Sequence, residues 1–223
     1  DLVARYGADT FRSYLMFIGP WEEGGPWSSR GIEGVHRFLN RVWNVVLEEP
    51  AEVAGEASLQ QIRELRRQTH QTIRKATEDM GAFKFNTMLA ALMAFNNYLV
   101  KAKETPVVKT EAWDEAIRTL ILLLAPSVPH ITEELWERIG GEYSVHQQPW
   151  PEWDEDLAAD EVMTLVVQVN GKLRDRIEVP VSIDEAKAKE LALTSARVQR
   201  HLKGKQIARI IFAQGRLVNI VAK

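Results

Sequence analysis

The sequence predicts a mainly α protein, an antiparallel helical bundle followed by a small α+β domain with the element order ββααββ. Apolar residues recur at helical spacing through most of the first 150 of the 223 residues. Asn170-Gly171, flanked by alternating apolar residues, then indicates a tight β-hairpin. Charge divides the chain at the same place. Residues 162–223 hold twelve Lys or Arg against five Asp or Glu, a net charge of +7, and the rest carries −10.

The first 30 residues predict two helices and a loop. Gly7 is placed to end a short first helix, and residues 8–17 form a second with apolar side chains at helical spacing. Residues 19–30 contain three Gly, two Pro and two Trp. We expect an ordered loop there, because tryptophans in a loop usually have a surface to pack against.

Residues 31–150 predict the helical bundle. Asn86 is suited to cap one helix, and Leu120–Leu124 are apolar nearly all round, which places their helix at the bundle centre. Pro126 ends that helix, and Pro129 can begin a last one that Gly140-Gly141 closes. The expected helices before that last one cover residues 31–48, 59–80, 86–103 and 113–125.

Residues 151–161 contain six acids and no base, which predicts an extended linker between bundle and C-terminal domain. In that domain, residues 162–223, we expect helices over 185–193 and 195–202. A second strand pair, 207–212 and 217–221, should surround Gln214-Gly215.

The hairpin carries the main candidate site. Period-two alternation after the turn puts Leu173, Ile177, Val179 and Val181 on one face of the strand. The other face then shows a row of cations that suits a nucleic-acid backbone. The row is Lys172, Arg174 and Arg176, joined in the same domain by Lys203, Lys205 and Arg209.

Two weaker basic stripes lie in the bundle. Arg37, Arg41 and Asn44 form the shorter one. The longer one, Arg63, Arg67, His70 and Arg74, follows one helix face, and we interpret it as a solvated surface rather than an RNA track.

Several function classes are excluded. There is no cysteine, so there is no disulfide framework and no thiolate metal site, and the cytoplasm is the expected compartment. No apolar stretch reaches the roughly 20 residues of a membrane span. No metal-binding or phosphate-binding motif and no catalytic constellation occurs. We expect His130 to order a helix start, and Glu133 and Glu134 to point to different sides of that helix.

Several blocks resemble a known family. Residues 6–12 resemble the segment that follows the adenylate-site loop of class I aminoacyl-tRNA synthetases. Residues 31–43, 85–93 and 122–136, with 169–174 and 215–221, are similar to the bacterial leucyl-tRNA synthetase family. The 122–136 block is shared with the valyl, isoleucyl and methionyl enzymes. Arg30 departs from the acidic or polar residue that relatives usually carry there.

The resemblance implies the tRNA-binding end of a larger ligase that joins leucine to its tRNA. Residues 1–30 would be a remnant of the stem-contact region, and residues 31–150 the anticodon-binding-type bundle. The small C-terminal domain would reach the tRNA elbow. Catalytic and editing domains would lie upstream, as the absence of an initiator Met at Asp1 also suggests. ATP and Mg would serve the parent enzyme, and this fragment itself would need no cofactor and have no catalytic residue.

The expected partners are leucine tRNA and those upstream domains, with no membrane, in a monomeric protein. An isoleucyl or valyl enzyme is an alternative, although the former often ends in a Cys-rich zinc module and the latter in a coiled coil. A helical protein-interaction module with a ubiquitin-like tail is the alternative from another class.

Overall fold

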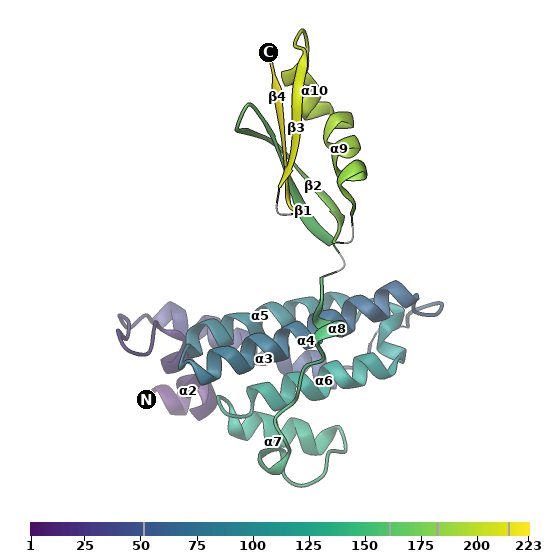
Figure 1. Cartoon of the computed structure of the whole chain (residues 1–223). Helices are drawn as coiled ribbons and strands as arrows, with labels where there is room; N and C mark the ends of the chain where they lie inside the picture. The colour runs from purple at the N-terminus through teal and green to yellow at the C-terminus, as the bar shows by residue number, and fades with distance from the viewer. Residues whose placement is uncertain (51, 161, 182, 214) are drawn as a thin grey trace. The chain divides into compact units, whose positions relative to one another are not determined.

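A computed structural model describes residues 1–50, 52–160, 162–181, 183–213 and 215–223 (Figure 1). The chain forms two compact units, Asp1–Ala159 and Asp160–Lys223. The first is helical and the second is an α+β domain, which confirms the predicted fold class. Position 161 of the expected linker and position 214 of the expected second turn lie outside the described residues.

The helical unit begins with the short pair α1 (Leu2–Tyr6) and α2 (Ala8–Phe17), as expected from Gly7. The larger helices then pack on one another in the bundle. They are α3 (Ser29–Leu47), α4 (Leu59–Gly81), α5 (Phe85–Ala102), α6 (Glu111–Leu124) and α7 (Pro129–Arg138). Two 3-10 turns, η1 (Pro106–Lys109) and η2 (Val145–Gln147), flank the last two helices.

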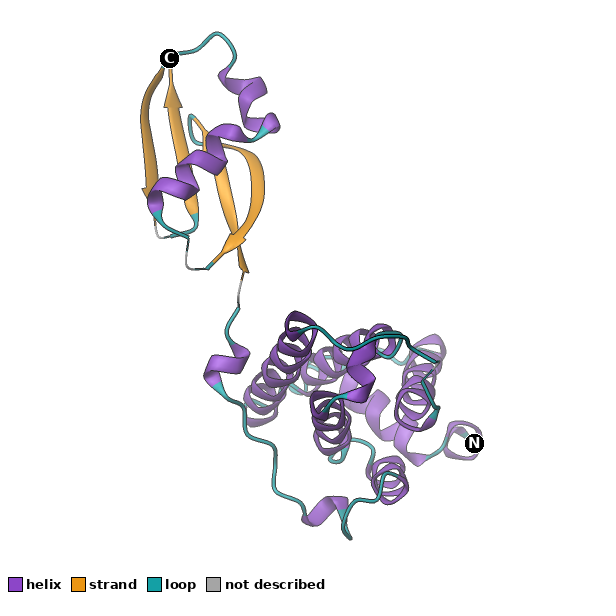
Figure 2. Ribbon diagram, turned by 90° about the vertical axis from the view of Figure 1, so that its right-hand side faces the viewer, coloured by secondary structure: helices purple, strands orange, loops and turns teal. Residues whose placement is uncertain are grey.

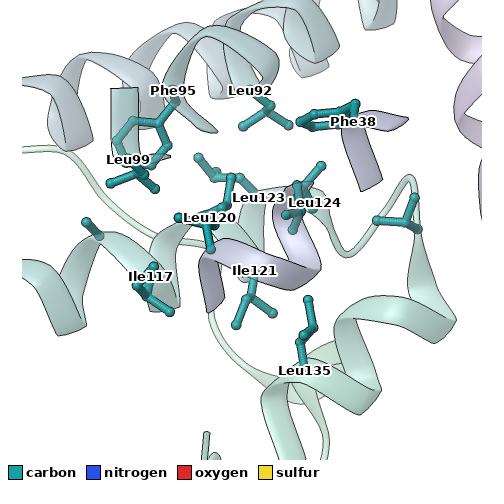
Figure 3. Packing of buried hydrophobic residues seen from close by; sticks show 14 of the residues in the cluster. Phe38, Leu92, Phe95, Leu99, Ile117, Leu120, Ile121, Leu123, Leu124 and Leu135 are labelled. Carbon is teal, nitrogen blue, oxygen red and sulfur yellow. The ribbon is translucent and has the colours of Figure 1, made fainter. Parts of the chain in front are cut away.

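Helix α6 lies in the middle of the hydrophobic core. Leu120, Ile121, Leu123 and Leu124 are completely buried, which confirms the expectation from their apolar run. Figure 3 shows them among side chains from neighbouring helices, including Phe38 of α3. Such burial contributes about 1.5–3 kcal/mol for each large aliphatic side chain, so these residues contribute strongly to the stability of the unit.

Helices α4 and α5 differ in how their first turns are capped. Ser58 and Gln61 form a reciprocal capping box at α4, in which each side chain accepts a hydrogen bond from the other residue's backbone N–H. Helix α5, however, begins at Phe85 after Lys84, without a side-chain cap. Asn86 therefore lies inside the first turn, and the prediction that it caps this helix was wrong.

The acidic segment contains a short helix, α8 (Glu155–Ala158), with Asp154 as its N-cap. Residues 151–159, which we expected to extend as a linker, lie in the helical unit, where α8 packs against α4. Their contacts explain the difference, because opposite charges and backbone hydrogen bonds hold them to that helix.

The second unit has a four-stranded sheet in the order β2-β1-β4-β3. Its strands are β1 (Val162–Val169), β2 (Lys172–Pro180), β3 (Ile207–Ala213) and β4 (Leu217–Ala222). The central strands β1 and β4 are parallel, and each outer strand is antiparallel to its neighbour. Helices α9 (Glu185–Thr194) and α10 (Ala196–Leu202) cover one face of the sheet, as Figure 2 shows.

Candidate nucleic-acid interface

The hairpin turn between β1 and β2 adopts the backbone that its sequence requires. Asn170 and Gly171 have φ values of 50° and 76°, the positive values of a type I′ turn. The Asn170 side chain also pairs with β4, because its amide donates to the Ala222 carbonyl and accepts from the Ala222 N–H, both at 2.9 Å. The turn is therefore fastened to the C-terminal end of the sheet.

A β-bulge on β2 breaks the predicted row of cations. Gln168 lies opposite Leu173, whereas Val167 lies opposite Asp175, so Arg174 is an extra residue without an opposite partner. Side chains directly opposite one another in a sheet share a face. Because of the extra residue, side chains that period-two counting assigns to one face of the sheet lie on opposite faces before and after the bulge.

Lys172 and Arg176 consequently lie on opposite faces. Lys172 pairs with Val169, which belongs to the core under the helices, and Arg176 pairs with Val166 on the uncovered face. Leu173, expected beside Ile177, instead lies opposite Gln168 and is 44% exposed. The single-face row was therefore wrong, because period-two counting does not detect a two-against-one pairing.

Tertiary pairing nevertheless brings other cations together at one end of the domain. Gln206 and Lys223 exchange backbone hydrogen bonds of 2.8 and 2.9 Å at the end of the sheet where Asn170 meets Ala222. The loop from α10 to β3 and the hairpin turn therefore lie at the same end of the sheet. We call this set the basic end: Lys172, Lys203, Lys205 and Lys223, all exposed.

Lys223 was missed by the sequence reasoning, since its position beside Gln206 depends on strand pairing. Arg176 and Arg209, also predicted, are exposed but lie within the strands on the uncovered face, where Arg209 pairs with Val221. Among the described residues, neither they nor the basic end form an ion pair.

Acidic side chains of this domain are mostly engaged elsewhere. Glu185 and Glu190 pair with Lys189 and Lys187 on α9. Asp175 accepts hydrogen bonds from Ser195 Oγ at 2.6 Å and from Arg197 at 3.2 Å. These bonds, that of Ser195 foremost, lower the pKa of the Asp175 carboxyl from its usual value of 3.8. Little negative charge remains to neutralise the basic end.

The two stripes of the bundle differ from each other. Arg37, Arg41 and Asn44 are exposed on one face of α3, without an ion pair among the described residues. On α4, by contrast, Arg67 holds Glu64 through two hydrogen bonds of 2.9 and 2.7 Å. The α3 stripe is therefore the better candidate for a second contact with a polyanion.

The other members of the α4 stripe face the acidic segment. Arg74 contacts Glu155 at 3.4 Å, and His70 is buried and bonded to Glu115 and to the Asp154 backbone. Arg63 is exposed. The expectation of a solvated face was wrong for His70, which the acidic segment of the same chain covers, whereas the Arg74 side chain keeps 39% exposure beside Glu155.

His130 has the structural role that we expected. Its Nδ1 lies 2.7 Å from Asp9 Oδ1, while Asp9 Oδ2 accepts from the Ile131 N–H at 2.7 Å, so a carboxylate from α2 caps α7. Glu133 and Glu134 bind different partners, Ser144 and Arg138.

Within the described part of the chain, no cluster of His, Asp or Glu could hold a metal ion. In the same described residues, no helix is long and apolar enough to cross a membrane.

Comparison with known proteins defines the class first. Residues 63–190 match the family described as the anticodon-binding domain of tRNA ligase, and the match covers more than half of the chain. The chain belongs to this family. The matched region runs from α4 through α9 and so includes parts of both units.

The relatives then specify which kind of tRNA ligase the chain is similar to. It is 52% identical to a leucine–tRNA ligase of Dehalococcoides mccartyi over 100% of this chain and 27% of the relative. It is 50% identical to that of Rubrobacter xylanophilus, over 99% of this chain and 26% of the relative. For the Deinococcus radiodurans enzyme the identity is 44%, over 100% and 27%. The chain thus spans about a quarter of the length of these relatives.

A solved structure agrees with the relatives. It is a ternary complex of LeuRS, tRNA and LeuAMS from Agrobacterium radiobacter K84. Its TM-score is 0.79 and its sequence identity 30%, over 100% of this chain and 30% of that chain.

Proposed function

We propose that this chain is the tRNA-binding portion of a leucine–tRNA ligase, which holds leucine tRNA while other domains of the enzyme leucylate and edit it. The observation that carries the proposal is the basic end, four exposed lysines without an acidic partner among the described residues, in a domain with a charge of +7. The identity to leucine–tRNA ligases and the likeness to a LeuRS–tRNA complex support it.

The basic end and the α3 stripe each suit an RNA backbone. Lysine side chains on loops and at strand ends can follow phosphates without reading bases, because ammonium groups bind as flexible point charges. Such binding releases counterions and depends steeply on salt. The predicted tRNA-binding residues Arg176 and Arg209 remain candidates on the uncovered face of the sheet, and Arg174 remains one at the bulge.

The test compares two double variants of equal charge. Lys203→Ala with Lys205→Ala removes part of the basic end, whereas Lys187→Ala with Lys189→Ala removes two lysines that pair with acids on α9. We expect the first pair to weaken binding of leucine tRNA. The slope of log K against log salt should fall by about 1.4–1.8, which corresponds to the loss of two phosphate contacts. The control pair should change the slope by much less. Equal slopes for both pairs would refute the assignment.

Catalysis belongs, in this proposal, to the domains that the longer relatives contain in addition. ATP and Mg would bind there, and the protein would act in the cytoplasm as a monomer. The chain alone should then fail to exchange pyrophosphate into ATP in the presence of leucine, because its sequence contains no phosphate-binding motif and no catalytic constellation to stabilise an adenylate. Exchange above a protein-free blank, in preparations without full-length enzyme, would contradict this expectation.

A further inference from the structure

Residues 150–158 bind along one face of helix α4. Trp150 Nε1 donates to Thr77 Oγ1 at 2.8 Å, the Asp154 N–H donates to His70 Nδ1 at 3.0 Å, and Gln71 donates to the Ala158 carbonyl at 2.9 Å. His70 and Thr77 are seven positions apart, about two helical turns, and Gln71 follows His70 directly, so the three partners lie within about a third of the helix circumference. We call residues 150–158 the strap.

Packing and charge add to these hydrogen bonds. Trp150 and Trp153 pack against the hydrophobic core of the bundle, and Ala158 is 1% exposed. Arg74 of α4 contacts Glu155 of the strap. A four-residue helix such as α8 is unstable in isolation, so its order depends on α4.

His70 is the buried contact at the middle of the strap. Its Nδ1 faces a backbone N–H and must accept, so its proton resides on Nε2, which donates to Glu115 Oε1 at 3.0 Å. Arg66 lies 3.5 Å from the other oxygen of Glu115. One neutral tautomer therefore joins α4, α6 and the strap.

We infer that His70 is a positioning residue for the C-terminal domain, acting through the strap. While the strap is bound, the tether to strand β1 consists of about three residues after Ala158. Release would extend it to about twelve residues and add about 30 Å of reach. If both units hold the same tRNA, as the proposed function states, a longer tether lowers the effective concentration of the basic end. With a −3/2 power dependence on length, the loss in affinity is about eightfold.

Two substitutions separate the bonds of His70. In His70→Asn, the amide oxygen can take the place of Nδ1 and accept from the Asp154 N–H. In His70→Gln, the longer side chain can reach Glu115 but offers no acceptor at the Nδ1 position. Gln71→Leu acts independently, because it removes the bond to the Ala158 carbonyl and leaves the buried pair intact.

The first measurement is hydrogen exchange of the strap amides in the 223-residue chain. We expect exchange at residues 153–158 to rise at least tenfold in His70→Gln and in Gln71→Leu, and to stay within about twofold in His70→Asn. Amide relaxation of residues 162–223 should show faster tumbling in the first two variants. Unchanged exchange in His70→Gln, or equal release in His70→Asn, would overturn the role of His70.

The second measurement is tRNA affinity at several salt concentrations. We expect about eightfold weaker binding in His70→Gln with an unchanged salt slope, because the phosphate contacts remain, and recovery in His70→Asn. A changed slope, or an unchanged affinity when exchange shows a released strap, would overturn the positioning role. If the unaltered chain does not bind tRNA, the proposed function fails, whereas the exchange experiment still decides the strap.

Discussion

Asn170 binds both backbone polar groups of Ala222, two residues that are 52 positions apart in the sequence. The side chain thereby continues the parallel pairing of β1 and β4 beyond the last residue of β1. It also holds Lys172 near the end of the chain, where Lys223 pairs with Gln206. Asn170 thus has two roles. It adopts a positive φ that the turn needs, and its side chain keeps Lys172 near Lys223 in the basic end.

Asn170→Gly should lower the free energy of unfolding of the C-terminal unit by about 1–3 kcal/mol. Glycine keeps the positive φ without strain but loses two side-chain hydrogen bonds, each of which contributes about 0.5–1.5 kcal/mol. Urea unfolding followed by amide NMR signals of residues 162–223 measures the change. An unchanged midpoint would mean that the bonds to Ala222 contribute nothing.

Asp175 should make the stability of the same unit depend on acid pH. Because its pKa is lower in the folded than in the unfolded chain, the unfolded chain takes up the proton first as pH falls. The stabilisation is therefore present above about pH 4 and is lost as pH falls through the folded pKa. Asp175→Asn should be less stable near neutral pH and show a shallower decline in acid, measured by melting temperature between pH 2.5 and 7. Parallel curves for both proteins would contradict this.

Asp9→Ala should destabilise the helical unit by about 1–2 kcal/mol, because α7 has no side-chain cap of its own and Asp9 supplies one from α2. Asp9→Asn keeps an acceptor for the Ile131 N–H and should lose less. Thermal unfolding of the helical signal compares the two. The idea fails if both substitutions cost the same.

Asn96→Leu should stabilise the bundle. The Asn96 side chain is completely buried on α5, and neither of its amide atoms has a hydrogen-bond partner among the described residues. Replacing an unpaired buried amide by an apolar group of similar size should raise the free energy of unfolding by about 1–3 kcal/mol. A lower melting temperature than that of the unaltered chain would show that the amide is satisfied in solution.

Arg37→Ala with Arg41→Ala should weaken tRNA binding more than Arg67→Ala, which removes a side chain already bound to Glu64. The salt slope should fall by about 0.7–0.9 for each phosphate contact of α3. Filter binding at four salt concentrations gives both quantities. Equal effects of Arg67→Ala and of each α3 substitution would remove the distinction between the two stripes.

Interactions between residues close in sequence made much of the fold predictable. The apolar faces of the helices, the break at Gly7 and the positive φ of Asn170 and Gly171 depend on neighbours within a few residues, and all of them are confirmed. The role of His130 at a helix start followed from its place in the first turn beside acids, although its partner Asp9 did not. Of the candidate cations in the C-terminal domain, five are exposed and Arg174 at the bulge is partly buried; the exposed ones are Lys172, Arg176, Lys203, Lys205 and Arg209.

By itself, then, the sequence determined the element order, the charge division and the central position of α6, because periodicity and composition are properties of short segments. Only the tertiary structure decided which charges meet. The bulge at Arg174 separated Lys172 from Arg176, strand pairing brought Lys172 to the loop of Lys203 and Lys205, and α4 bound the acidic strap through residues 84 positions away. Register and docking depend on the best sum of many long-range contacts, and no local pattern contains that sum.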